Sequence, residues 1–99
     1  MIAYIAGPYR AKTKLGIIRN ILKARKAAKE FWAKGYTVIC PHTNSVLMKH
    51  LPEEVFMKGD LEILKKSDVL VVMKGWQKSE GTKREIDFAK KNGIAIIWM

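Results

Sequence analysis

The residues best suited to chemistry in this sequence lie in the stretch 67–85, where a predicted strand leads into a predicted helix. The strand is the apolar run Val69 to Met73, and the helix starts at Ser79. A serine at this position accepts a hydrogen bond from an unpaired N–H of the first turn, and the remaining N–H groups attract an anion. Gly81 and Glu85 follow two and six residues after Ser79. A carboxylate beside a phosphate-sized site predicts chemistry on a phosphorylated small molecule. The alternative is a capped helix with Glu85 on its solvated face.

Two further segments carry candidate site residues. After the first predicted strand the loop contains Gly7, Tyr9 and Arg10. The glycine permits close approach of a ligand, the tyrosine offers a flat face to a base or sugar, and the arginine offers a fork to phosphate. Asp60 lies in a helical stretch directly before Leu61. An acid there is most often solvated, but the apolar residues that follow place this one at the edge of the buried face.

The elements that must position these residues alternate between strand-like and helix-like patterns. Strands are predicted at 2–6, 36–40, 69–73 and 94–98, as short apolar runs bounded by Gly, Pro or polar residues. Helices are predicted at 13–34, 52–66 and 79–92, and the stretch 42–50 is a long loop or a short helix. Their ends are marked by Thr13 and Ser79 as caps, Pro52 at a first helical position, and Gly35 and Gly93 as stops. The apolar positions expected at helical spacing are Ile17, Ile18, Ile21, Leu22, Ala28, Phe31 and Trp32, then Val55, Leu61 and Leu64.

Strand–helix alternation predicts a single α/β domain over residues 1–99, with helices on both faces of a parallel sheet. Right-handed crossovers and a switch point at the site give four strands in the order 2-1-3-4, with three main helices. Ligands of such sheets bind beyond the carboxyl ends of the strands, where the strand order reverses. The segments 7–12, 41–45 and 75–85 are therefore expected to converge.

The composition limits the classes of function. The chain has 99 residues, a net charge of +10 and a pI of about 9.9, which favours an anionic partner, either a nucleotide or a nucleic acid. The basic run 14–34 is typical of the solvated face of an amphipathic helix. Its aromatic residues do not alternate with the basic ones as a surface that stacks on bases requires, so the sequence argues against nucleic acid. Cys40, the single cysteine, excludes an internal disulfide and fits a reducing cytoplasm. With His42 and His50 it forms no zinc-like ligand set, so no metal is expected. No apolar run reaches the ~20 residues of a membrane span, and no basic leader precedes the first strand, so neither membrane nor secretion is expected.

Together these segments resemble the nucleoside 2-deoxyribosyltransferase family, which includes the 2′-deoxynucleoside 5′-phosphate N-hydrolases. The resemblance covers nearly the whole chain in order and spacing. It implies a small flavodoxin-like doubly wound sheet, no cofactor, and an assembly of two or more copies. The stretch Cys40-Pro41-His42-Thr43-Asn44 is most similar to the short uncharacterised phage and bacterial branch. The motifs that carry the resemblance are Tyr4-Ile5-Ala6-Gly7-Pro8-Tyr9-Arg10, Asp60-Leu61 eight residues before Asp68, and Ser79-x-Gly81-x-x-x-Glu85.

The resemblance also implies the chemistry of a retaining glycosidase, with a nucleoside or nucleotide as the small-molecule substrate. Glu85 matches the nucleophile that attacks C1′ of a deoxyribosyl group, and Asp60 matches the acid that assists departure of the base. The positions that match the holders of the 5′ end or its phosphate are Gly7, Arg10, Ser79 and Gly81. The remaining expected substrate contacts are Tyr9, His42 and Asn44.

Two departures from the family pattern bear on these expectations. Characterised members continue past the last strand and complete a neighbour's site there, whereas this sequence ends at Trp98-Met99. Either a neighbour contributes in another way, or the site is open and catalysis is impaired. The Lys83-Arg84 pair before Glu85 is more basic than in the enzymes and favours a more anionic ligand.

Three functions stay open at this point. The first is cleavage or transfer of an N-glycosidic bond, the second a non-catalytic nucleotide-binding or sensing module on the same fold, and the third a basic protein that associates with nucleic acid. The presence of both Asp60 and Glu85 favours the enzyme. The sequence does not separate hydrolase from transferase, and it does not identify the base.

Overall fold

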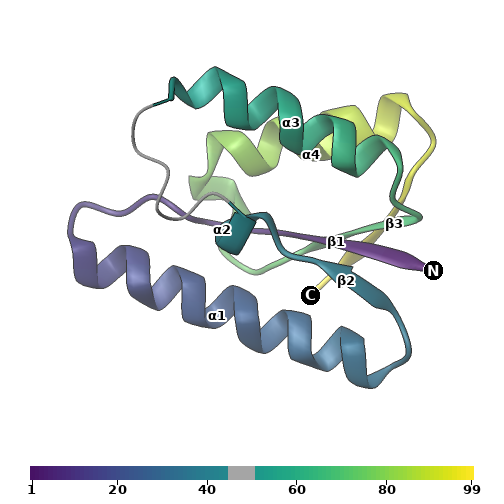
Figure 1. Cartoon of the computed structure of the whole chain (residues 1–99), viewed down its shortest axis with the longest axis horizontal. Coiled ribbons are helices and arrows are strands. Elements are labelled where there is room, and N and C mark those ends of the chain that lie inside the picture. Colours follow the sequence, from purple (N-terminus) through teal and green to yellow (C-terminus); the bar gives the residue numbers. More distant parts are fainter. Residues whose placement is uncertain (45–50) are drawn as a thin grey trace.

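The computed structural model describes residues 1–44 and 51–99, with side chains for 1–42 and 51–99. Figure 1 shows three layers, with α1 on one face of a central sheet and α3 and α4 on the other. The elements in chain order are β1 (Ile2–Ala6), α1 (Lys14–Ala33), β2 (Thr37–Ile39), α2 (Pro41–Asn44), α3 (Glu53–Lys65), β3 (Val69–Val72), the 3-10 turn η1 (Trp76–Lys78), α4 (Glu80–Lys91) and β4 (Ala95–Trp98).

The sheet is parallel throughout and has the order β2-β1-β3-β4, which confirms the predicted topology. β1 lies between β2 and β3, with Ala3 opposite both Val38 and Val69. From β1 the chain crosses to β2 on one side, and it then returns past β1 to form β3 and β4 on the other side. The carboxyl ends of β1 and β3 therefore border a crevice at the point where the strand order reverses.

Alternation along the strands separates two cores. On the α1 side, Ala3 and Ile5 of β1 pack against a helix face made of Ala24, Ala27, Ala28 and Phe31. On the other side, Tyr4 and Ala6 share a cluster with Leu64 of α3 and with Ile86 and Ala89 of α4. Successive strand residues point to opposite faces of a sheet. Position 4 is therefore directed toward α4, the helix that carries Glu85.

The helix ends follow the predicted capping chemistry. The Oγ atoms of Thr13 and Ser79 accept hydrogen bonds from the backbone N–H groups of Gly16 at 3.0 Å and Thr82 at 3.2 Å. Gly35 has the left-handed φ of +95° that a stop after α1 requires. The prediction for Pro52 is wrong by one position, since Pro52 is the N-cap of α3 and the first helical residue is Glu53.

Several expected core positions face solvent instead. Ile18, Leu22 and Trp32 of α1 are exposed, because the helix buries its alanine stripe and Phe31. Residues two apart lie about 200° apart around a helix, so burial of Ala24 turns Leu22 outward. In α3, Val55 is exposed while Leu64 is buried. Leu64 follows Val55 by nine positions, which corresponds to about two and a half turns and places the two side chains on opposite sides of the helix.

Candidate active site

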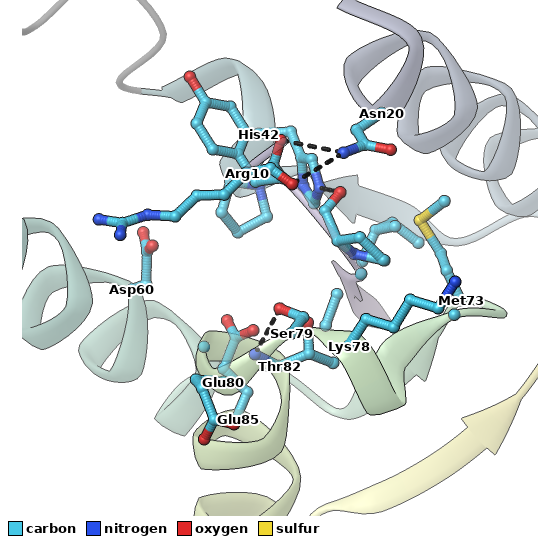
Figure 2. A pocket seen from close by; sticks show the side chains of 18 of the residues that line it. Arg10, Asn20, His42, Asp60, Met73, Lys78, Ser79, Glu80, Thr82 and Glu85 are labelled. Carbon is cyan, nitrogen blue, oxygen red and sulfur yellow. Dashed lines mark hydrogen bonds between the residues drawn. The ribbon is translucent and has the colours of Figure 1, made fainter. Parts of the chain in front are cut away.

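A cavity of about 940 Å³ opens at the carboxyl ends of β1 and β3. It is walled by the loop after β1, by α1, α2 and α3, and by the segment from Met73 to the first turns of α4 (Figure 2). Every sequence-predicted site residue except Asn44 lines this cavity. The side chain of Asn44 lies outside the described residues. The predicted residues on its wall are Gly7, Tyr9, Arg10, His42, Asp60, Ser79, Gly81 and Glu85.

The carboxyl group of Glu85 is buried at the base of this cavity. The side chain is 8% exposed, and its Oε2 accepts a hydrogen bond from the hydroxyl of Tyr4, which is itself fully buried. Burial raises the pKa of Glu85 to about 7, the hydrogen bond from Tyr4 lowers it in part, and the charge of Asp60 raises it. Burial, followed by the negative charges of Glu85 and Asp60, raises the pKa of Tyr4 far above its ordinary value, so the phenol remains a donor. The interpretation of Glu85 as a solvated residue is wrong.

Asp60 projects into the same cavity from α3. It is half-buried, and burial raises its pKa to about 6. The charge that Asp60 acquires when it ionises raises the pKa of Glu85, so the two carboxyl groups do not ionise independently. Between about pH 6 and pH 7 the two carboxyl groups hold one proton between them.

The loop after β1 is held in place from both sides. His42 of α2 donates from Nε2 to the carbonyl of Pro8 at 2.9 Å, and its ring contacts the ring of Tyr9 edge-on at 5.6 Å between centroids. From α1, Nδ2 of Asn20 donates to the carbonyls of Tyr9 at 3.1 Å and Arg10 at 3.4 Å. Burial lowers the pKa of His42, so the ring is neutral at neutral pH. The loop is therefore a fixed wall.

Gly7 closes this wall against β3. A Cβ atom at position 7 would lie 2.7 Å from Sδ and 2.9 Å from Cβ of Met73, closer than real atoms approach. Any larger residue here would push the loop away from the strand. Gly7 thus lets the backbone of the loop pack directly on the side chain of Met73. This role is additional to the close approach of a ligand that the sequence predicts.

Arg10 crosses the mouth of the cavity. Its guanidinium forms an ion pair with Glu53 in the first turn of α3, and both side chains are well exposed. The pair joins the loop after β1 to the helix that carries Asp60. Exposed ion pairs contribute little to stability, so an anion of higher charge density can compete for this arginine.

The first turn of α4 forms the opposite wall. The Oγ atom of Ser79 accepts a second hydrogen bond, at 2.9 Å, from the hydroxyl of the buried Thr82. Gly81 lies against α3, since a Cβ there would be 3.2 Å from Cε of Met57. The first turn of α4 is thereby packed closely against α3. Its first backbone N–H groups lie at the end of the helix that borders the cavity.

The described part of the chain offers neither a metal centre nor a membrane span. Its His, Cys, Asp and Glu side chains nowhere gather in threes at a spacing that could hold a metal ion. None of its helices is both long and apolar enough to cross a bilayer.

Comparison with known proteins places the chain in a family. The family model described as "Domain of unknown function (DUF4406)" matches residues 1–98. The chain belongs to the DUF4406 family. Among solved structures it is similar to the 2-deoxyribosyltransferase of the psychrotolerant bacterium Bacillus psychrosaccharolyticus, with a TM-score of 0.72 and 20% identity over 99% of this chain and 71% of that chain. The likeness shows that the DUF4406 chain shares that protein's fold. Among curated proteins, no sequence matches it.

Sequence reasoning missed several residues that build this DUF4406 site. Tyr4 reads as a core aromatic inside an apolar run, although a buried tyrosine hydroxyl usually has a partner, and that rule was an available signal. Asn20 has no motif and is recognised only by its two carbonyl contacts. The turn η1, which carries Lys78, lies between the predicted strand 69–73 and the predicted helix 79–92, where the sequence predicts neither element.

Proposed function

We propose that this protein cleaves or transfers the N-glycosidic bond of a 2′-deoxynucleoside or its 5′-phosphate through a covalent glycosyl-enzyme on Glu85. The observation that carries the proposal is the buried Glu85 carboxyl, held by the Tyr4 hydroxyl and sharing a cavity with Asp60. Two carboxyl groups in one cavity are the minimum that a double displacement at a sugar carbon needs. The likeness in fold to a 2-deoxyribosyltransferase supports the same choice.

In the first proposed step, Oε1 of Glu85 bonds to C1′ of the sugar while the bond from C1′ to the base nitrogen breaks. The electron pair of that bond goes to the base, which takes a proton from Asp60. Tyr4 keeps its hydrogen bond to Oε2 and thereby presents Oε1 toward the sugar. In the second step, water or a second base attacks C1′, its proton returns to Asp60, and Glu85 leaves as a carboxylate.

The raised pKa values of Asp60 and Glu85 suit these two reaction steps. A bound base covers Asp60 and removes the water that remains around it, which raises the pKa of Asp60 further. Positive charge that develops on the sugar beside Glu85 lowers the pKa of Glu85. Both changes move the shared proton onto Asp60 as the transition state is approached, where the leaving base needs it.

The remaining cavity residues hold the substrate in this proposal. Tyr9 lies along the sugar and base, and Gly7, Ser79, Gly81 and Arg10 lie at the 5′ end. His42 contributes by fixing the loop that carries Tyr9, since its Nε2 is engaged by Pro8. Asn44 completes the expected set.

We also propose that copies of the chain associate. The outer face of α1 exposes Leu15, Ile18, Leu22 and Trp32, each more than half exposed. Such a stripe on a small domain is typical of a surface that another protein covers. Light scattering at tens of micromolar should give a mass above 11.3 kDa, and a monomer there would contradict the association.

The decisive test is incubation with the four common 2′-deoxynucleosides and their 5′-phosphates, followed by chromatography for released base. Wild type should release base from at least one of them. Glu85→Gln, which keeps size and hydrogen bonding but cannot form the ester, should lose about a thousandfold or more of that rate. Glu62→Gln, an exposed change on α3 away from the cavity, should have no effect. Equal base release by wild type and Glu85→Gln contradicts the nucleophile, and binding without base release from any substrate makes the protein a nucleotide-binding module.

A further inference from the structure

The charged side chains around the cavity divide into paired and unpaired groups. Arg10 is paired with Glu53, and Glu80 is paired with Lys83 at 3.3 Å. Three further lining residues are lysines that form no ion pair with any described residue: Lys23, Lys74 and Lys78. All three are exposed, and together they bring three positive charges to one cavity.

These lysines reach the wall of the cavity from three separate segments of the chain. Lys23 extends from α1, Lys74 follows β3, and Lys78 belongs to η1 directly before Ser79. Figure 2 shows Lys78 on the side away from Asp60, with Ser79 between them. We refer to Lys23, Lys74 and Lys78 as the lysine end. We refer to Asp60 and Glu85 as the carboxyl end, and in that view Ser79, at the N-terminus of α4, separates Asp60 from Lys78.

One phosphoryl group does not account for the lysine end. The first turn of α4 already offers backbone N–H groups and a positive helix end to a phosphate next to the sugar. The lysines belong to other segments than that turn and line the same cavity. Three like charges in one cavity repel one another unless an anion lies between them. The cavity volume of about 940 Å³ is near the upper end of the range for small-molecule sites, about 300–1,000 Å³. There is room for a ligand that extends past a single phosphate.

We propose that Lys23, Lys74 and Lys78 form a polyphosphate-binding end of this cavity, so that the preferred ligand is a 2′-deoxynucleoside di- or triphosphate. This rests on the proposed function for the placement of the sugar at the carboxyl end. The phosphate next to the sugar lies at the α4 turn, and the second and third phosphates lie among the lysines. The lysines determine specificity and take no part in bond breaking.

Binding is measured by calorimetry on Glu85→Gln, which prevents turnover, with EDTA present so that the phosphates carry no metal. The ligands are each 2′-deoxynucleoside with its mono-, di- and triphosphate, and inorganic triphosphate alone. The comparison adds Lys23→Gln, Lys74→Gln and Lys78→Gln together to the same background. Its matched control is Lys26→Gln, Lys65→Gln and Lys91→Gln, which removes the same charge from exposed positions off the cavity wall.

The triphosphate should bind at least about tenfold more tightly than the monophosphate, because charge-assisted hydrogen bonds are the strong ones. The lysine-end variant should lose that gain and keep its affinity for the nucleoside, while the control variant keeps both. Equal affinity for mono- and triphosphate overturns the inference, as does an equal loss in the control variant. Inorganic triphosphate that binds as tightly as the nucleotide overturns it too. Lysine-dependent triphosphate binding with no base release by wild type leaves the lysine end standing and contradicts the glycosidic chemistry alone.

Discussion

The two ends of the cavity are built in opposite ways. At the carboxyl end, Tyr4 is fully buried in the central strand and Glu85 is 8% exposed on a helix packed against it. At the lysine end, Lys74 and Lys78 are exposed and lie in the connection between β3 and α4. Burial shifts proton affinity and fixes position, which bond breaking requires. Long exposed side chains keep full hydration and reach, which suits the capture of a charged ligand.

The largest effect that separates the two ends is expected for Asp60→Asn. Loss of a general acid should lower base release by about 10²–10⁴-fold, because the leaving base no longer receives a proton. Deoxyribosides with leaving groups that need no proton should be cleaved at near wild-type rates, and this rescue is specific to an acid. If both substrate types slow equally in steady-state assays, Asp60 has another role.

Stability against pH tests the burial of the carboxyl end without any substrate. The folded protein holds a proton on Glu85 up to about pH 7, whereas the unfolded chain releases it near pH 4.5. A raised pKa adds stability that is fully present below the unfolded value and is lost as pH rises through the folded value. Relative to wild type, Glu85→Gln should therefore gain up to about 3 kcal/mol between pH 4 and pH 8. Urea unfolding at the two pH values measures this, with Glu62→Gln as the control that shows no such change.

A smaller effect is expected for Tyr4→Phe. Removal of one oriented hydrogen bond should lower the turnover number about 10- to 100-fold while KM changes little. The hydrogen bond from Tyr4 lowers the pKa of Glu85, so its loss should move the acid limb of the pH–rate profile upward. A fall in rate with an unmoved limb would assign Tyr4 a packing role only.

The smallest effect is expected for Arg10→Ala, at the mouth between the two ends. Its exposed guanidinium is shared with Glu53, so nucleotide binding should weaken only about two- to fivefold. Arg84→Ala is a close control, since Arg84 is also exposed and pairs with Glu54 in the same turn of α3 at 3.0 Å. Calorimetry should show weaker binding for the first variant and unchanged binding for the second. A loss larger than that of the lysine-end variant would move the main phosphate contact to Arg10.

Features that depend on residues close together in the sequence could be predicted, whereas contacts between distant residues could not. The caps at Thr13 and Ser79 and the sheet order rest on local chemistry and general chirality, and the sequence predicts them. The partner of Tyr4 is 81 residues away, so no spacing rule reports it. The prediction that Ile18, Leu22 and Trp32 of α1 are buried is wrong, because alanine buries as readily as leucine when a helix lies close to a sheet. Packing against β1 determines whether the alanine face or the leucine and isoleucine face of α1 is buried. The sequence of the helix alone does not show which face packs on the strand.

The position of the first strand in the middle of the sheet has a consequence for how the chain is made. β1 leaves the ribosome well before β3, yet its pairing with β3 joins Ala3 to Val69, and the hydroxyl of Tyr4 meets its carboxyl partner at residue 85. β1 therefore lacks one neighbour until the chain has emerged as far as Val72, the end of β3. Contacts so distant in sequence make folding slow and leave an apolar strand edge open to other chains during synthesis. A nascent-chain arrest series should show that protease resistance appears only after β3 has cleared the exit tunnel.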